Sequence, residues 1–127
     1  MDDPKQDTAS VPDELEAEYA NNVMFEATIW DLKLIFGEFS QLLRNGNVEW
    51  HTSITMPWAQ AKLLAYYLTA NVIAHEIRVG TIQIPAPVVP PEWPTPDPTD
   101  AVAVEIHKRL QDLHSRFMAE MQIPKKV

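Results

Sequence analysis

The sequence predicts an α+β fold: a three-stranded antiparallel sheet packed by one long helix, then a Pro-rich arm and a C-terminal amphipathic helix. Three observations predict this fold. Apolar and polar residues alternate through much of 22–56, as in strands with one buried face. Apolar residues recur every three or four positions in 57–78, as in a helix. Seven prolines fall within residues 85–98, where they interrupt both patterns.

Composition divides the chain into four segments. Residues 1–18 hold seven acidic residues and one lysine, which is −6 of the formal net charge of −8. They contain few large apolar residues, so we expect a disordered acidic tail. Residues 19–84 form the predicted β-β-β-α core domain, 85–98 the arm, and 99–123 the C-terminal docking helix.

The first two strands are predicted from residue 22 onward. The first run alternates its apolar residues with Met24, Glu26 and Thr28, and a bend is expected at the step from Trp30 to Asp31. A second alternating run leads to Phe39. The apolar residues of the two runs are Val23, Phe25, Ala27 and Ile29, then Leu32, Leu34 and Phe36.

The third strand follows the strongest turn signal of the chain, Asn45-Gly46-Asn47. Asn-Gly tolerates the positive φ angles of a tight hairpin turn, so this segment should join antiparallel neighbours. Alternation then predicts one face made of Val48, Trp50, Thr52, Ile54 and Met56.

A long helix is predicted over 57–78, with Pro57 at its first position and an end near Gly80. One side carries Ala61, Leu64, Ala65, Leu68, Val72 and His75. The rest of its circumference is also apolar, which is unusual for a surface helix and predicts a second buried contact. These further residues are Leu63, Tyr66, Tyr67, Ala70, Ile73 and Ile77.

The prolines of 85–98 should preclude helix and favour an extended polyproline II path. Thr99 or Asp100 is the expected cap of the last helix. Such a helix is marginally stable alone, so we expect its stripe to dock on the body or on another copy. The stripe consists of Val102, Ile106, Leu110, Leu113, Phe117 and Met121.

Several function classes are disfavoured by composition. The chain has no cysteine, so thiolate metal sites and thiol nucleophiles are excluded. No uncharged apolar run approaches the ~20 residues that span a bilayer. An acidic tail on a nearly neutral body repels phosphate, so neither nucleic acid nor a membrane surface is an expected partner. We expect a cytoplasmic protein.

The four histidines form no recognisable metal or catalytic pattern. His75 begins the run HEIRV, which lacks the second histidine of a zinc helix. His107 and His114 lie two helical turns apart, too far to share an ion without a third ligand. They and His51 are expected to face solvent. With only three glycines, a Gly-rich phosphate loop is also missing. We therefore expect no catalytic residue, cofactor or metal.

The central part of the chain resembles a bacterial family of small domains of unknown function. The resemblance rests on Tyr19, Asn21, Phe36, Gly37, Pro57, Ala61, Lys62, Asn71, Gly80 and Ile82. Two positions depart from the family pattern: Ile35, where Asp is usual, and Met56, where a capping Ser or Thr is usual. The resemblance covers about half of the chain and implies a β-β-β-α unit without an assigned activity.

A fainter likeness is to the export chaperone SecB. The course of the chain from the long helix through VGTIQIPAPVVPP to the terminal amphipathic helix is similar in layout to the carboxyl half of that chaperone, and the acidity and the antiparallel strands agree. This likeness implies an oligomer whose aromatic-rich grooves hold extended peptide.

The sequence thus predicts a non-enzymatic, oligomeric protein-interaction module, in its simplest form a homodimer. A SecB-like peptide-binding chaperone is one alternative, and an enzyme of unrecognised type is another. Another protein is a further candidate partner of such a module, and the chaperone alternative would add unfolded peptide. The expected interface residues are Trp30, Tyr66, Tyr67, Val102, Ile106, Leu110, Leu113 and Phe117.

Overall fold

The computed structural model describes residues 11–39 and 47–121. The elements are β1 (Asn22–Ala27), β2 (Asp31–Phe39), β3 (Val48–Pro57), α2 (Trp58–Val79), the 3-10 turn η1 (Ala86–Val88) and α3 (Ala101–Met121). The chain divides into two units, Met1–Tyr66 and Tyr67–Val127, with the boundary inside α2. We call these the sheet unit and the helical unit. Residues 11–18, from the predicted tail, are exposed.

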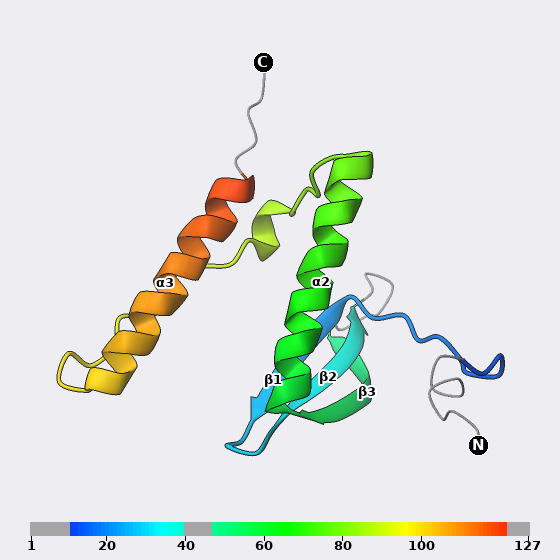
Figure 1. The fold of residues 1–127 in the computed structure, drawn as a ribbon, viewed down its shortest axis with the longest axis horizontal. Coiled ribbons are helices and arrows are strands. Elements are labelled where there is room, and N and C mark those ends of the chain that lie inside the picture. The colour runs from blue at the N-terminus through cyan, green and yellow to red at the C-terminus, as the bar shows by residue number, and fades with distance from the viewer. Residues whose placement is uncertain (1–10, 40–46, 122–127) are drawn as a thin grey trace, which may run out of the picture. The chain divides into compact units, whose positions relative to one another are not determined.

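The three strands form an antiparallel sheet in the order β1-β2-β3 (Figure 1). Together with the two long helices, this sheet confirms the predicted α+β class. Phe39 pairs with Val48, so β2 and β3 are antiparallel neighbours, as the turn signal predicts. Asn45 and Gly46 themselves lie outside the described residues.

One face of the sheet is apolar across all three strands. Phe25 pairs with Leu34 and Leu34 pairs with Ile54, and directly paired residues lie on the same face. Leu34 is 7% exposed, and among the described residues it is the one buried large apolar side chain. The same alternation places two further rows on this face: Val23, Phe36 and Thr52, and Ala27, Leu32 and Met56.

A bulge in β3 moves two residues away from the face on which the sequence predicts them. The register shifts between Phe36 and Gly37, which makes Trp50 the partner of Gly37. Strict alternation predicts Trp50 and Val48 on the face of Ile54. The extra residue places both on the opposite face, because one inserted residue reverses the alternation beyond it.

The turn between β1 and β2 is organised by Thr28. Its N–H donates to the carbonyl of Asp31 at 2.9 Å, and its Oγ1 accepts from the N–H groups of Trp30 and Asp31, each at 3.0 Å. The predicted extension of β1 to Ile29 is wrong because this hydroxyl bonds the backbone in place of a strand partner. Trp58 Nε1 donates to the Thr28 carbonyl at 2.8 Å, which ties the start of α2 to the turn.

The bounds of α2 lie within one residue of the predicted 57–78 at each end. The sequence predicts Pro57 inside the helix, but Pro57 ends β3, where it pairs with Asp31, and the helix begins at Trp58. A proline without an N–H is tolerated at the end of an edge strand. At the other end, the Gly80 N–H donates to the Glu76 carbonyl at 2.9 Å with φ at 126°, which confirms the predicted end.

The segment that precedes α3 contains a helical turn that the sequence prediction excludes. In η1, the Val88 N–H donates to the Pro85 carbonyl at 3.0 Å. A single 3-10 turn needs few N–H donors and accepts the fixed φ of proline, so a proline-rich segment can form one.

Asp100 caps α3, and it is one of the two residues, Thr99 and Asp100, that the sequence predicts as the cap. Its Oδ1 accepts from the Ala103 N–H at 3.0 Å. Thr99 instead bonds to Asp97: its N–H and its hydroxyl donate to Oδ1 at 3.0 and 2.8 Å. The backbone bond first, and then the hydroxyl bond, lower the pKa of the Asp97 carboxyl.

Replacement of the cap, Asp100→Ala, should lower the free energy of unfolding by about 1 kcal/mol, because the N–H of Ala103 loses its acceptor. Urea unfolding followed by far-ultraviolet circular dichroism measures this loss. Asp112→Ala is the control, since it removes only an exposed ion pair with Arg116. Equal losses in the two variants would show that the cap adds nothing specific.

Candidate interaction surfaces

In the sheet unit, apolar side chains are exposed around the buried Leu34. Phe25 is 58% exposed although it pairs directly with Leu34, and Ile54 on the other side of Leu34 is also exposed. Trp30, an expected interface residue, lies in the β1–β2 turn and is 78% exposed. The apolar face of the sheet therefore carries exposed side chains beside the buried Leu34.

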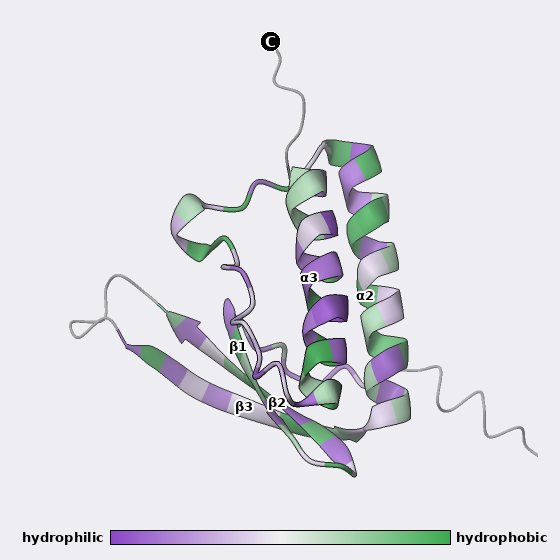
Figure 2. Ribbon diagram, turned by 90° about the vertical axis from the view of Figure 1, so that its left-hand side faces the viewer, coloured by the Kyte–Doolittle hydropathy of each residue, from purple (hydrophilic) through white to green (hydrophobic). Residues whose placement is uncertain are grey.

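The helix α2 is apolar on more than one side and has no buried residue. Ala61 and Leu64 are half-buried. The expected interface residues Tyr66 and Tyr67 are both more than half exposed, and Ile77 is 81% exposed. Hydrophobic colour recurs along α2, whereas α3 is mostly hydrophilic in the same view (Figure 2). Exposed apolar surface of this extent is common at interaction sites of proteins.

The half-buried side of α3 is rotated relative to the predicted stripe. Of the expected interface residues, Leu110 and Phe117 are half-buried, whereas Val102, Ile106 and Leu113 are exposed. The half-buried positions recur at helical spacing, so they define one continuous side. They are Ala103, His107, Leu110, Gln111, His114, Phe117, Met118 and Met121.

The Pro-rich segment packs on this side of α3. His114 Nε2 lies 3.0 Å from the Pro90 carbonyl, and both residues line a small cavity with Trp93, Leu113 and Phe117. The sequence predicts that His107 and His114 both face solvent, but both are half-buried, and the Pro90 carbonyl engages the ring of His114. Trp93 and His114 are absent from the expected interface set. The sequence signal for this packing is Trp93 in the run Pro91-Glu92-Trp93-Pro94. A large apolar side chain in an otherwise Pro-rich arm indicates that the arm packs on another part of the chain.

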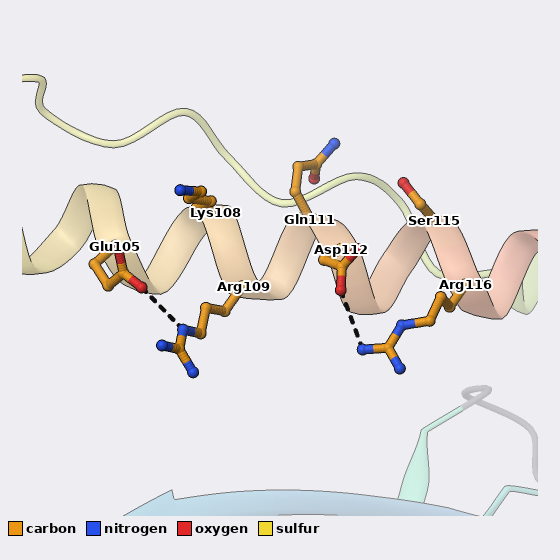
Figure 3. Close-up of a pocket in the computed structure, with 7 residues that line it drawn as sticks. All are labelled: Glu105, Lys108, Arg109, Gln111, Asp112, Ser115 and Arg116. Carbon is orange, nitrogen blue, oxygen red and sulfur yellow. Dashed lines mark hydrogen bonds and ion pairs between the residues drawn. The ribbon is translucent and has the colours of Figure 1, made fainter.

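The opposite side of α3 is charged (Figure 3). Arg109 donates to Glu105 at 2.9 Å and Arg116 to Asp112 at 3.1 Å, both pairs being four residues apart. The hydrogen bond from Arg109 and its charge lower the pKa of Glu105. Two of its three cations are paired with acids four residues away, and Lys108 adds a third positive charge on this surface.

His51 connects β3 to the residues before β1. Its Nε2 lies 2.9 Å from the Tyr19 carbonyl and its Nδ1 2.7 Å from Thr52 Oγ1, while Glu18 lies 3.8 Å from Nδ1. A carbonyl can only accept, so Nε2 carries the proton and Nδ1 accepts from the hydroxyl. His51 is an exposed residue, as expected, and these bonds also join β3 to the residues before β1.

Within the described ranges, no group of three histidine or acidic residues is placed to hold a metal ion. No helix in this part of the chain is long and apolar enough to cross a membrane. No family model, no curated protein and no solved structure matches the chain.

Proposed function

We propose that this chain is a non-enzymatic protein-interaction module that assembles with copies of itself. One observation supports the proposal. In residues 11–39 and 47–121, Leu34 is the one buried large apolar side chain, whereas large apolar side chains are exposed on all three strands and on both long helices.

The energetic argument follows from the size of that core. Full burial of one leucine contributes about 1.5–3 kcal/mol, whereas ordering the backbone of a single residue costs about 1–2 kcal/mol. One buried leucine cannot offset the ordering of three strands. Further apolar burial has to stabilise the sheet, and a symmetric homodimer is the commonest arrangement that supplies it.

Size-exclusion chromatography with light scattering at micromolar concentration tests the proposal. The expected mass is at least twice the 14.5 kDa of one chain. The melting temperature should also rise with protein concentration, because association stabilises the folded state by mass action. A particle of one chain whose melting temperature is independent of concentration would contradict the proposal.

A peptide-binding chaperone of the SecB kind is the second candidate. The exposure of aromatic side chains favours it, since Phe25, Trp30, Tyr66 and Tyr67 are all more than half exposed. Such rings bind extended apolar segments with little loss of conformational entropy. A chaperone should suppress the aggregation of an unrelated unfolding protein at near-stoichiometric amounts, whereas a self-assembling interaction module should have no effect.

A further inference from the structure

One stripe of α2 has the spacing of a helix–helix interface. Its residues follow one another at intervals of three, four, three and four positions, which places them on one side of the helix. All are exposed, and Ile77 is the most exposed among them. The stripe consists of Leu63, Tyr66, Ala70, Ile73 and Ile77. All five residues lie on one continuous helix, so the geometry of α2 alone determines their positions relative to one another.

The spacing of the stripe is nearly symmetric about Ala70. Leu63 lies seven residues before Ala70 and Ile77 seven residues after it, and Tyr66 and Ile73 lie four before and three after. A second copy of the helix that runs antiparallel would therefore place Leu63 against Ile77 at both ends. The smallest residue would lie on the two-fold axis, where a small side chain lets two helices approach closely.

The charges beside the stripe favour the antiparallel direction. Lys62 and Glu76 lie fourteen residues apart on the same flank of α2, Lys62 before the stripe and Glu76 near its end. An antiparallel partner places each Lys62 beside the Glu76 of the other copy, so two complementary pairs form. Glu76 Oε2 accepts from the Ile82 N–H at 2.9 Å, and a carboxylate accepts further bonds. Antiparallel helix dipoles also attract each other.

The apolar area is adequate for a stable pair. The five stripe residues and the flanking Tyr67 are six side chains in each copy. At roughly 100 Å² on average, more for the tyrosines and less for Ala70, two copies would bury roughly 1,200 Å² in total, the lower end for a specific interface.

We propose that two copies of this chain pair through α2, antiparallel and two-fold symmetric about Ala70. This proposal rests on the self-assembly proposed above and names the surface that carries it. A second copy is the occupant because the stripe is nearly symmetric about Ala70 and the charges of its flank are complementary to themselves.

The absence of cysteine from the sequence allows a direct test with single-cysteine variants of the full chain. In Ala70→Cys the two thiols meet at the axis, so mild oxidation should link most of the protein as a dimer on a non-reducing gel. Leu63→Cys is the matched control. Its two thiols would lie about 21 Å apart along the helix axes, calculated from the rise of about 1.5 Å per residue, so they should stay unlinked. A mixture of Leu63→Cys and Ile77→Cys chains should link again.

A charge exchange provides a second test that needs no oxidation. Lys62→Glu and Glu76→Lys should each raise the dissociation constant of their own dimer at least tenfold, because both flank pairs become like-charged. An equimolar mixture of the two variants restores both complementary pairs. Its dissociation constant should return to within about threefold of that of the unmodified chain.

The outcomes separate this inference from the proposed function. Efficient linkage of Leu63→Cys to itself would indicate a parallel pair and overturn the antiparallel arrangement. Absence of linkage in Ala70→Cys, with the unmodified chain still a dimer by light scattering, would overturn the α2 surface and leave self-assembly standing. An unmodified chain that is a monomer would overturn both.

Discussion

Leu34→Ala should unfold the sheet unit at room temperature. Leu34 is at the centre of β2, pairs with Phe25 and Ile54 on its two sides, and is the one buried large apolar side chain in the described part of the chain. Truncation of a buried leucine costs about 2–5 kcal/mol, through lost transfer energy and the cavity that remains. A fold with a small core has no such reserve of stability.

Chemical unfolding followed by tryptophan fluorescence measures the effect, since Trp30 and Trp50 report on the sheet. Leu15→Ala is the matched control because Leu15 is 66% exposed, and it should change the midpoint little. If both leucine variants unfold at the midpoint of the parent protein, Leu34 does not form the core. Leu34→Ile, which keeps most of the volume, should retain most of the stability.

The elements themselves could be predicted because each depends on a short-range periodicity. The alternation through Val23 and Phe25, and again through Leu32 and Leu34, needs only the geometry of a pleated strand. The spacing of apolar residues after Pro57 likewise needs only 3.6 residues per turn. These patterns are local, so the sequence contains them in full.

The errors fall where one residue depends on a contact distant in sequence or on a single side-chain hydrogen bond. The β3 bulge depends on Trp50 finding space opposite Gly37, thirteen residues earlier, which alternation cannot reveal. The early end of β1 depends on the Thr28 hydroxyl.

The candidate surfaces could be predicted only in part, for a related reason. Tyr66 and Tyr67 follow from an apolar circumference that one layer of contacts cannot cover, and both are exposed. The rotation of α3 could not be predicted, because it depends on the Pro90 carbonyl engaging His114 twenty-four residues later. An apolar stripe indicates that a helix has a partner, but the partner determines which side is covered.

Gly37→Ala should also destabilise the protein strongly, because β2 and β3 approach each other closely at Gly37. A Cβ at this position would lie 2.7 Å from the Glu49 carbonyl oxygen, 2.7 Å from Trp50 Cε3 and 2.9 Å from Val48 Cγ1. All three distances are shorter than van der Waals contact. The carbonyl belongs to the backbone of β3, so it can move away only if the pairing between the strands opens.

We expect Gly37→Ala to lower the free energy of unfolding by about 3 kcal/mol, the upper end for overpacking of a tightly packed site, because backbone atoms as well as side chains resist the new methyl group. The double variant Gly37→Ala with Trp50→Ala separates the two obstacles. It should remain as unstable as Gly37→Ala alone, since removing the indole leaves the Glu49 carbonyl at 2.7 Å. Recovery of the parent's melting temperature in the double variant would show that the indole, and not the β3 backbone, requires glycine at this position.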